Sequence, residues 1–122
     1  MVDPTTARKN INRRYEAKNR RSIELFNEAT KDAVAIRRLI ESKYRPQRIY
    51  QWGSLLHPER FDENSDIDFA VEGITAPETF FSMLGDAMKL TRLPLDIVQI
   101  EKIEIEFADA IRQSGMVVYE RA

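Results

Sequence analysis

Two aspartates separated by one residue are the side chains in this sequence best suited to metal chemistry. Asp66 and Asp68 lie in the run Ser-Asp-Ile-Asp-Phe-Ala-Val, whose alternation predicts a strand over residues 66 to 72. Residues two apart on a strand point to the same face, which places the two Cα atoms roughly 6.5 Å apart. Like charges at that spacing repel, and aspartate is depleted in strands, so the pair costs stability unless a cation offsets it. Carboxylate oxygens favour Mg²⁺, with Mn²⁺ as the alternative.

A third carboxylate and a glycine turn extend this pattern. Asp96 lies near the start of a strand predicted over residues 95 to 100, and a third carboxylate on a neighbouring strand would allow two metal ions roughly 3.5 to 4 Å apart. Gly53 ends another predicted strand, residues 48 to 52, and a glycine there lets the backbone approach a phosphate closely. Ser54 can donate hydrogen bonds from both its amide and its hydroxyl. Together these residues predict a site for a metal ion and a phosphate.

Each of these signals also has a simpler interpretation. Asp-x-Asp is most often a turn or a solvated edge, and Asp96 could simply cap or end its strand. Arg60 stands between the glycine turn and the carboxylates, where it could reach a triphosphate or equally be a solvated loop arginine. Counting from Asp62, the acidic run also imitates the start of an EF-hand calcium loop. That interpretation is disfavoured because Ile67 and Gly73 stand where the loop requires glycine and glutamate.

The other periodic segments predict helices packed on a small sheet. Residues 22 to 43 repeat apolar side chains at three- and four-residue steps, and Pro46 ends this helix. A last helix is stopped by Gly115, and residues 117 to 119 read as a terminal strand. We therefore expect an α/β or α+β fold in which helices cover a small mixed sheet.

A further helix is predicted from Pro77 to about Lys89. Thr75 and Glu78 are spaced as a capping box, and proline is favoured in the first turn. The predicted apolar stripe of this helix consists of Phe81, Leu84 and Met88.

Charge is divided unevenly along the chain. Residues 1 to 48 carry 13 Lys and Arg against 6 acids, while residues 49 to 122 carry 6 against 14, which together give the net charge of -1. Residues 5 to 21 are compatible with a helix but hold few apolar side chains, so we expect an extension that becomes ordered on a partner. A solvated basic helix is the alternative.

Length and composition limit the classes of protein that this sequence can represent. The chain of 122 residues and 14.2 kDa predicts a single domain, residues 1–122, with a basic helical segment at 1–44 and a catalytic core at 45–122. This is small for an enzyme, which leaves room for a partner or a second copy to complete the site. The absence of cysteine excludes disulfides and thiolate metal sites. No apolar run approaches the roughly 20 residues that span a bilayer, so we expect a cytoplasmic protein without membrane contact.

Taken together, three motifs of this sequence resemble the DNA polymerase beta-like nucleotidyltransferase superfamily. They are Gly53-Ser54, the run from Ser65 to Val71, and the segment Leu95-Asp96-Ile97-Val98. The resemblance covers about residues 49 to 119 and is closest to the minimal nucleotidyltransferase (MNT) branch. Each motif by itself is a weak signal, and the order of the three motifs along the chain makes the resemblance specific.

The resemblance implies a role for each of these residues. The glycine-serine turn would hold the β- and γ-phosphates of ATP, Asp66 and Asp68 would bind two Mg²⁺ ions, and Asp96 would bind the catalytic metal and help to deprotonate the attacking hydroxyl. Minimal members commonly form toxin-antitoxin pairs with a HEPN-domain protein, and some transfer AMP from ATP to a tyrosine of that ribonuclease. The implied function is thus an MNT antitoxin that adenylylates a HEPN toxin.

Two departures from the family pattern leave alternatives open. Many relatives carry an Arg-Gly pair shortly after the glycine-serine turn, whereas residues 55–60 read Leu-Leu-His-Pro-Glu-Arg, so the residue that neutralises the triphosphate is not identified. The basic leader is also longer than a minimal fold needs. The alternatives are an antitoxin that acts by docking alone, a transferase acting on a small molecule, and nucleic-acid contact through residues 8 to 21.

Overall fold

Four strands form the central sheet, in the order β3-β2-β1-β4. The structure is a computed structural model that describes residues 3–122. Strand β1 pairs antiparallel with both β2 and β4, and β2 pairs parallel with β3, so the sheet is mixed. The strands are β1 (Arg48–Trp52), β2 (Ile67–Glu72), β3 (Leu95–Gln99) and β4 (Met116–Glu120).

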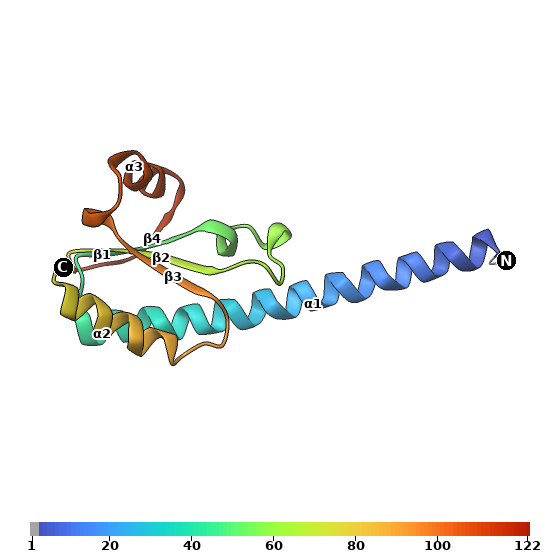
Figure 1. Cartoon of the computed structure of the whole chain (residues 1–122), viewed down its shortest axis with the longest axis horizontal. Coiled ribbons are helices and arrows are strands. Elements are labelled where there is room, and N and C mark those ends of the chain that lie inside the picture. The colour runs from blue at the N-terminus through green and yellow to red at the C-terminus, as the bar shows by residue number, and fades with distance from the viewer. Residues whose placement is uncertain (1–2) are drawn as a thin grey trace.

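Helices cover both faces of this sheet (Figure 1). Helices α1 (Pro4–Leu39) and α2 (Pro77–Met88) lie on one face, and α3 (Ile105–Ser114) lies on the other. Successive side chains of β2 point to opposite faces of the sheet, and this explains why helices pack on both faces. Phe69 belongs to the core under α1 and α2, whereas Ala70 packs with Ile111 of α3. The predicted α/β fold with a small mixed sheet is confirmed.

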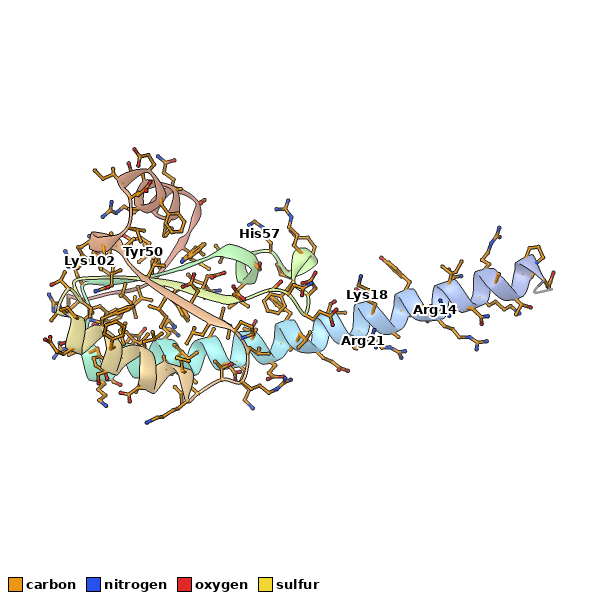
Figure 2. The ribbon with its side chains drawn as sticks, in the orientation of Figure 1. Arg14, Lys18, Arg21, Tyr50, His57 and Lys102 are labelled. Carbon is orange, nitrogen blue, oxygen red and sulfur yellow. The ribbon has the colours of Figure 1, made fainter. Side chains whose placement is uncertain are left out.

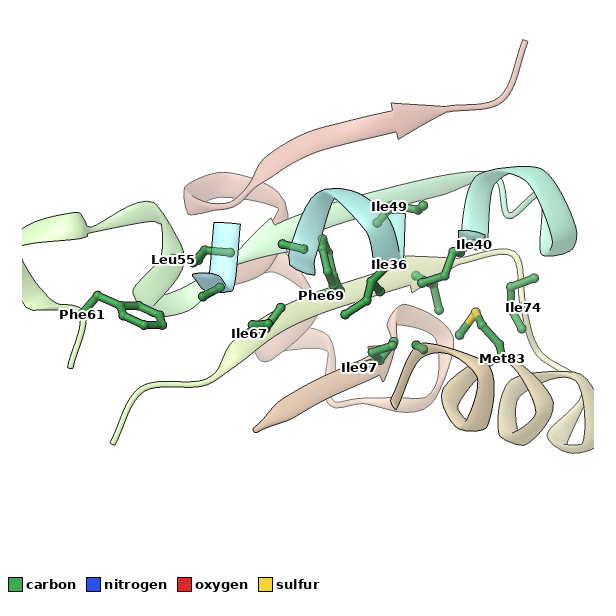
Figure 3. Packing of buried hydrophobic residues seen from close by; sticks show 14 residues of the cluster. Ile36, Ile40, Ile49, Leu55, Phe61, Ile67, Phe69, Ile74, Met83 and Ile97 are labelled. Atoms are coloured by element: carbon green, nitrogen blue, oxygen red, sulfur yellow. The ribbon is translucent and has the colours of Figure 1, made fainter. Parts of the chain in front are cut away.

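The larger core lies between the sheet and the first two helices. Figure 3 shows side chains from α1, α2 and three strands meeting there, with Ile36 and Phe69 fully buried. Leu55 and Phe61 continue the core beneath the loop that follows β1. This packing fixes the ends of β1, β2 and β3 relative to one another.

Helix α1 fills most of the basic helical segment that the sequence predicted at 1–44. Its helical hydrogen bonding runs from Pro4, so residues 5 to 21 are already helical without a partner. A π-helical turn (Ile40–Tyr44) follows, and the chain leaves it at Arg45, whose φ of 48° is left-handed, immediately before Pro46. The predicted end of the helix before the proline is therefore confirmed. Among residues 3–122, no helix has the length and apolar character needed to cross a membrane.

Two details predicted for α2 are wrong. The helix begins after Ala76 without a side-chain cap, so Thr75 and Glu78 do not form a capping box. The face that packs on the sheet is built on Met83 and Ala87, with Leu84 of the predicted stripe partly buried against the same core, whereas the exposed fractions of Phe81 and Met88 are 67% and 58%. Two apolar stripes run along this helix, and periodicity alone does not decide which of them faces the sheet.

Candidate active site

Strand pairing brings the residues of the predicted site to one edge of the sheet. Asp68 of β2 is paired with Trp52 at the end of β1 and, on its other side, with Asp96 of β3. Directly paired residues point to the same face, so the carboxylates of Asp68 and Asp96 emerge on neighbouring strands roughly 5 Å apart. Asp66 immediately precedes β2, and its charge acts on Asp68. Three acidic residues thus lie around the start of two parallel strands.

Gly53 is held against this carboxylate group by its backbone conformation. Its φ is +77°, and a Cβ at this position would overlap Oδ2 of Asp68. Glycine is therefore required twice, once for the left-handed turn and once for the close approach. A short 3₁₀ turn (Gly53–Leu56) starts here and carries Ser54. The glycine turn therefore lies directly beside the carboxylate of Asp68.

Asp68 is the most electrostatically strained of the three aspartates. It is only 8% exposed, and its burial, together with the charges of Asp66 and then Asp96, raises its pKa to about 6. No hydrogen bond or cation among residues 3–122 acts in the opposite direction. A carboxylate in these surroundings gains from any cation that approaches it.

The donor set fits a divalent metal ion. The three side chains offer hard oxygen ligands, and nothing in the described part of the chain neutralises Asp68. Within residues 3–122, however, no three acidic, histidine or cysteine side chains are close enough to form an assembled metal cluster. The carboxylates are neighbours along the sheet, and their oxygens would have to converge further to share an ion.

Trp52 forms the wall of the site on the side of α3. Its indole contacts the ring of Phe107 edge to face, with centroids 5.3 Å apart and an interplanar angle of 88°. The Nε1 atom of Trp52 is buried and has no hydrogen-bond partner in the described structure. Strand pairing places Trp52 beside Asp68.

Arg60 lies apart from the aspartates. It ends a second 3₁₀ turn (Pro58–Arg60), is exposed, and lines a groove between this loop and α1 together with Lys18 and Ser22. Its predicted role in nucleotide binding stays a prediction. The groove was not predicted, since it depends on where a long helix passes a loop distant in the sequence.

Most of this chain matches a known protein family. The sequence profile of the family described as "Polymerase beta, Nucleotidyltransferase" matches residues 35–122, well over half of the chain. The chain belongs to this nucleotidyltransferase family. The match includes all the strands and the candidate site and leaves out most of α1.

Solved structures share the fold. One, described as the crystal structure of the toxin-antitoxin MntA-HepT, is 17% identical over 75% of this chain and 73% of that chain, with a TM-score of 0.56. Another, described as a toxin-antitoxin with AMP-PNP, is 16% identical over the same shares, with a TM-score of 0.58. A search of curated protein sequences found no match. At these identities the structural likeness establishes the fold.

Proposed function

We propose that this protein is a metal-dependent nucleotidyltransferase that acts as an MNT antitoxin by transferring AMP from ATP to a tyrosine of a HEPN-type ribonuclease. The observation that carries the proposal is the register that places Asp68 between Asp96 and the end of the strand leading to Gly53. Membership of the nucleotidyltransferase family and a fold shared with toxin-antitoxin structures support it.

Each residue of the site has a separate role in this proposal. Asp66, Asp68 and Asp96 would hold Mg²⁺, and a divalent metal bound there supplies charge stabilisation for the phosphoryl oxygens and lowers the pKa of the attacking hydroxyl. Gly53 leaves room for the triphosphate, and Ser54 donates to it from its amide and hydroxyl. The raised pKa of Asp68 is a cost that cation binding would offset.

The proposed reaction exchanges the phosphoanhydride bond between the α- and β-phosphates of ATP for a phosphate ester bond to tyrosine. The tyrosine oxygen of the acceptor forms a bond to the α-phosphorus of ATP, and pyrophosphate leaves with the electrons of the α–β bond. In this proposal Asp96, which is exposed on β3, takes the hydroxyl proton. Binding of the acceptor beside this edge would complete the site.

Co-expression with the protein encoded beside it in its genome tests this function. We expect intact-mass analysis of that protein to show the addition of AMP on tyrosine, together with loss of its toxicity. The variant that combines Asp66→Asn with Asp68→Asn should abolish the addition. If the double variant still transfers AMP, the assignment of the site is wrong. If it transfers none and still suppresses toxicity, docking alone accounts for the antitoxin activity.

A further inference from the structure

The first half of α1 lies outside the body of the protein. Figure 1 shows it extending well past the end of the sheet, and among residues 4–21, which we call the N-terminal arm, only Ala7 and Ala17 are even half-buried. Ile11 and Tyr15 are 64% and 72% exposed. At 1.5 Å per residue, the part of the arm before Lys18 reaches about 20 Å. This length lies outside the family match and takes no part in the proposed reaction.

The charge of the arm is uncompensated. It carries seven basic residues against one acid, Glu16, and none of the seven forms an ion pair with another residue in the range 3–122. Like charges face each other one turn apart in the pairs Lys9–Arg13 and Arg14–Lys18. Asp3 at the N-cap is the one acidic residue at the start of α1, and the first turn that follows it has none. A bound anion would offset these costs.

Helical geometry arranges six of the basic residues as two ridges. At 100° per residue, the centres of the ridges are about 130° apart around the helix, and Thr6, Asn10 and Ala17 lie between them. This face lies about 130° from the residues of α1 that pack on the sheet, so it points away from the body. One ridge consists of Lys9, Arg13 and Arg20. The other consists of Arg14, Lys18 and Arg21, all three of which are labelled along the helix in Figure 2.

We propose that the N-terminal arm is a binding element for double-stranded DNA that lies in the major groove. The groove is about 12 Å wide and admits one α-helix, with phosphates on both sides to meet the two ridges and base edges facing Asn10. The deep, narrow major groove of an RNA duplex does not admit a helix in this way.

The charge distribution favours a polyanion over a protein partner. The only large apolar side chains on the arm are Ile11 and Tyr15, too few for a stable protein interface of roughly 800 Å² per partner. The acidic loop that includes Asp62 and Glu63 lies beside the base of the arm, where it lines a pocket together with Lys18 and Arg21, and the arm before Lys18 extends past it. The proposal does not depend on nucleotidyl transfer.

Fluorescence anisotropy with a labelled 30-base-pair DNA duplex (about three helical turns) tests this inference in the full-length protein. We expect binding at 50 mM KCl and a loss of affinity of roughly a thousandfold at 200 mM, as for about six phosphate contacts. The variant Arg13→Ala/Arg14→Ala removes one cation from each ridge. We expect it to bind at least tenfold more weakly at 50 mM KCl and to make the log-log salt dependence shallower by about 2.

A charge-matched variant separates the arm from general electrostatics. Lys89→Ala/Lys102→Ala removes two exposed lysines from the body and should bind DNA as the wild type does; Lys102 lies far from the arm in Figure 2. Circular dichroism confirms that each variant keeps its helix. Equal losses in the two variants, or no DNA binding at 50 mM KCl, would overturn the proposal. Tighter binding to an RNA duplex or to vesicles containing phosphatidylserine would overturn the assignment to DNA.

Discussion

Asp68 connects the chemistry of the site to the stability of the fold. Burial and two neighbouring aspartates raise its pKa to about 6, so the native state holds the proton more tightly than the unfolded chain, in which an aspartate has a pKa of about 3.9. Without metal, the stability that protonated Asp68 contributes is therefore lost as the pH rises from about 4 to about 6.

Replacing this carboxylate should therefore stabilise the metal-free protein at high pH. In EDTA at pH 8, we expect Asp68→Asn to raise the free energy of unfolding by about 2 kcal/mol, and the gain should vanish below pH 4. Urea unfolding across this pH range measures it. The exposed Asp109→Asn on α3 serves as the control and should show no such dependence. A gain that is the same at pH 4 and pH 8 would show that the charge of Asp68 is not the cause.

Gly53 allows a second test at the residue scale. Gly53→Ala places a methyl group on Asp68 at a φ of +77°, so we expect it to destabilise the fold by at least about 1 kcal/mol and to weaken nucleotide binding. Gly85→Ala is the matched control, because position 85 is inside helix α2 and the added Cβ meets no atom within 4 Å apart from its own neighbouring helical backbone. This change should stabilise the protein by about 0.5 to 1 kcal/mol. Thermal unfolding that ranks the two variants in the opposite order contradicts the account of the turn.

Helix α1 combines two elements with different roles. Its C-terminal half packs on the sheet through Ala29, Ala33 and Ile36, which are buried, whereas Ile11 in the arm is 64% exposed. Helix formation propagates easily from a packed nucleus, which explains why residues predicted to become ordered on a partner are already helical.

Replacing isoleucine by alanine should therefore lower the free energy of unfolding by very different amounts in the two halves of α1. Ile36→Ala leaves a cavity under the sheet, and we expect it to cost about 2 to 5 kcal/mol of unfolding free energy. Ile11→Ala should change it by less than about 0.5 kcal/mol. Urea denaturation of both variants measures the difference. A comparable loss from Ile11→Ala would mean that the arm packs against the body.

Sequence patterns predicted the elements better than their packing. Strand β1 was predicted with the bounds that the structure shows, because its apolar residues lie between a proline turn and Gly53. The packing face of α2 was wrong because Phe81 and Met83 are equally apolar in the sequence. The arrangement of the site could be predicted only in part. Alternation places Asp66 and Asp68 on one face, but the pairing of Asp68 with both Trp52 and Asp96 is a property of the folded sheet.

At the scale of the whole molecule, the chain separates two kinds of charge. The nucleotidyltransferase domain at 35–122 contains the acidic site, and the basic arm extends away from it (Figure 1). This separation would keep the proposed metal site and the proposed DNA-binding arm from neutralising each other. Asp96 is exposed on the edge strand β3, and we propose that an acceptor protein approaches there.

We propose that the three aspartates support transfer of a nucleotidyl group, and a labelling experiment tests this role directly. The purified protein is incubated with Mg²⁺, the protein encoded beside it, and ATP labelled on either the α- or the γ-phosphate. We predict that the acceptor retains the α-label but not the γ-label, that EDTA or Asp96→Asn abolishes labelling, and that Asp109→Asn does not. Labelling from γ-labelled ATP, or α-labelling that survives Asp96→Asn, would contradict the account.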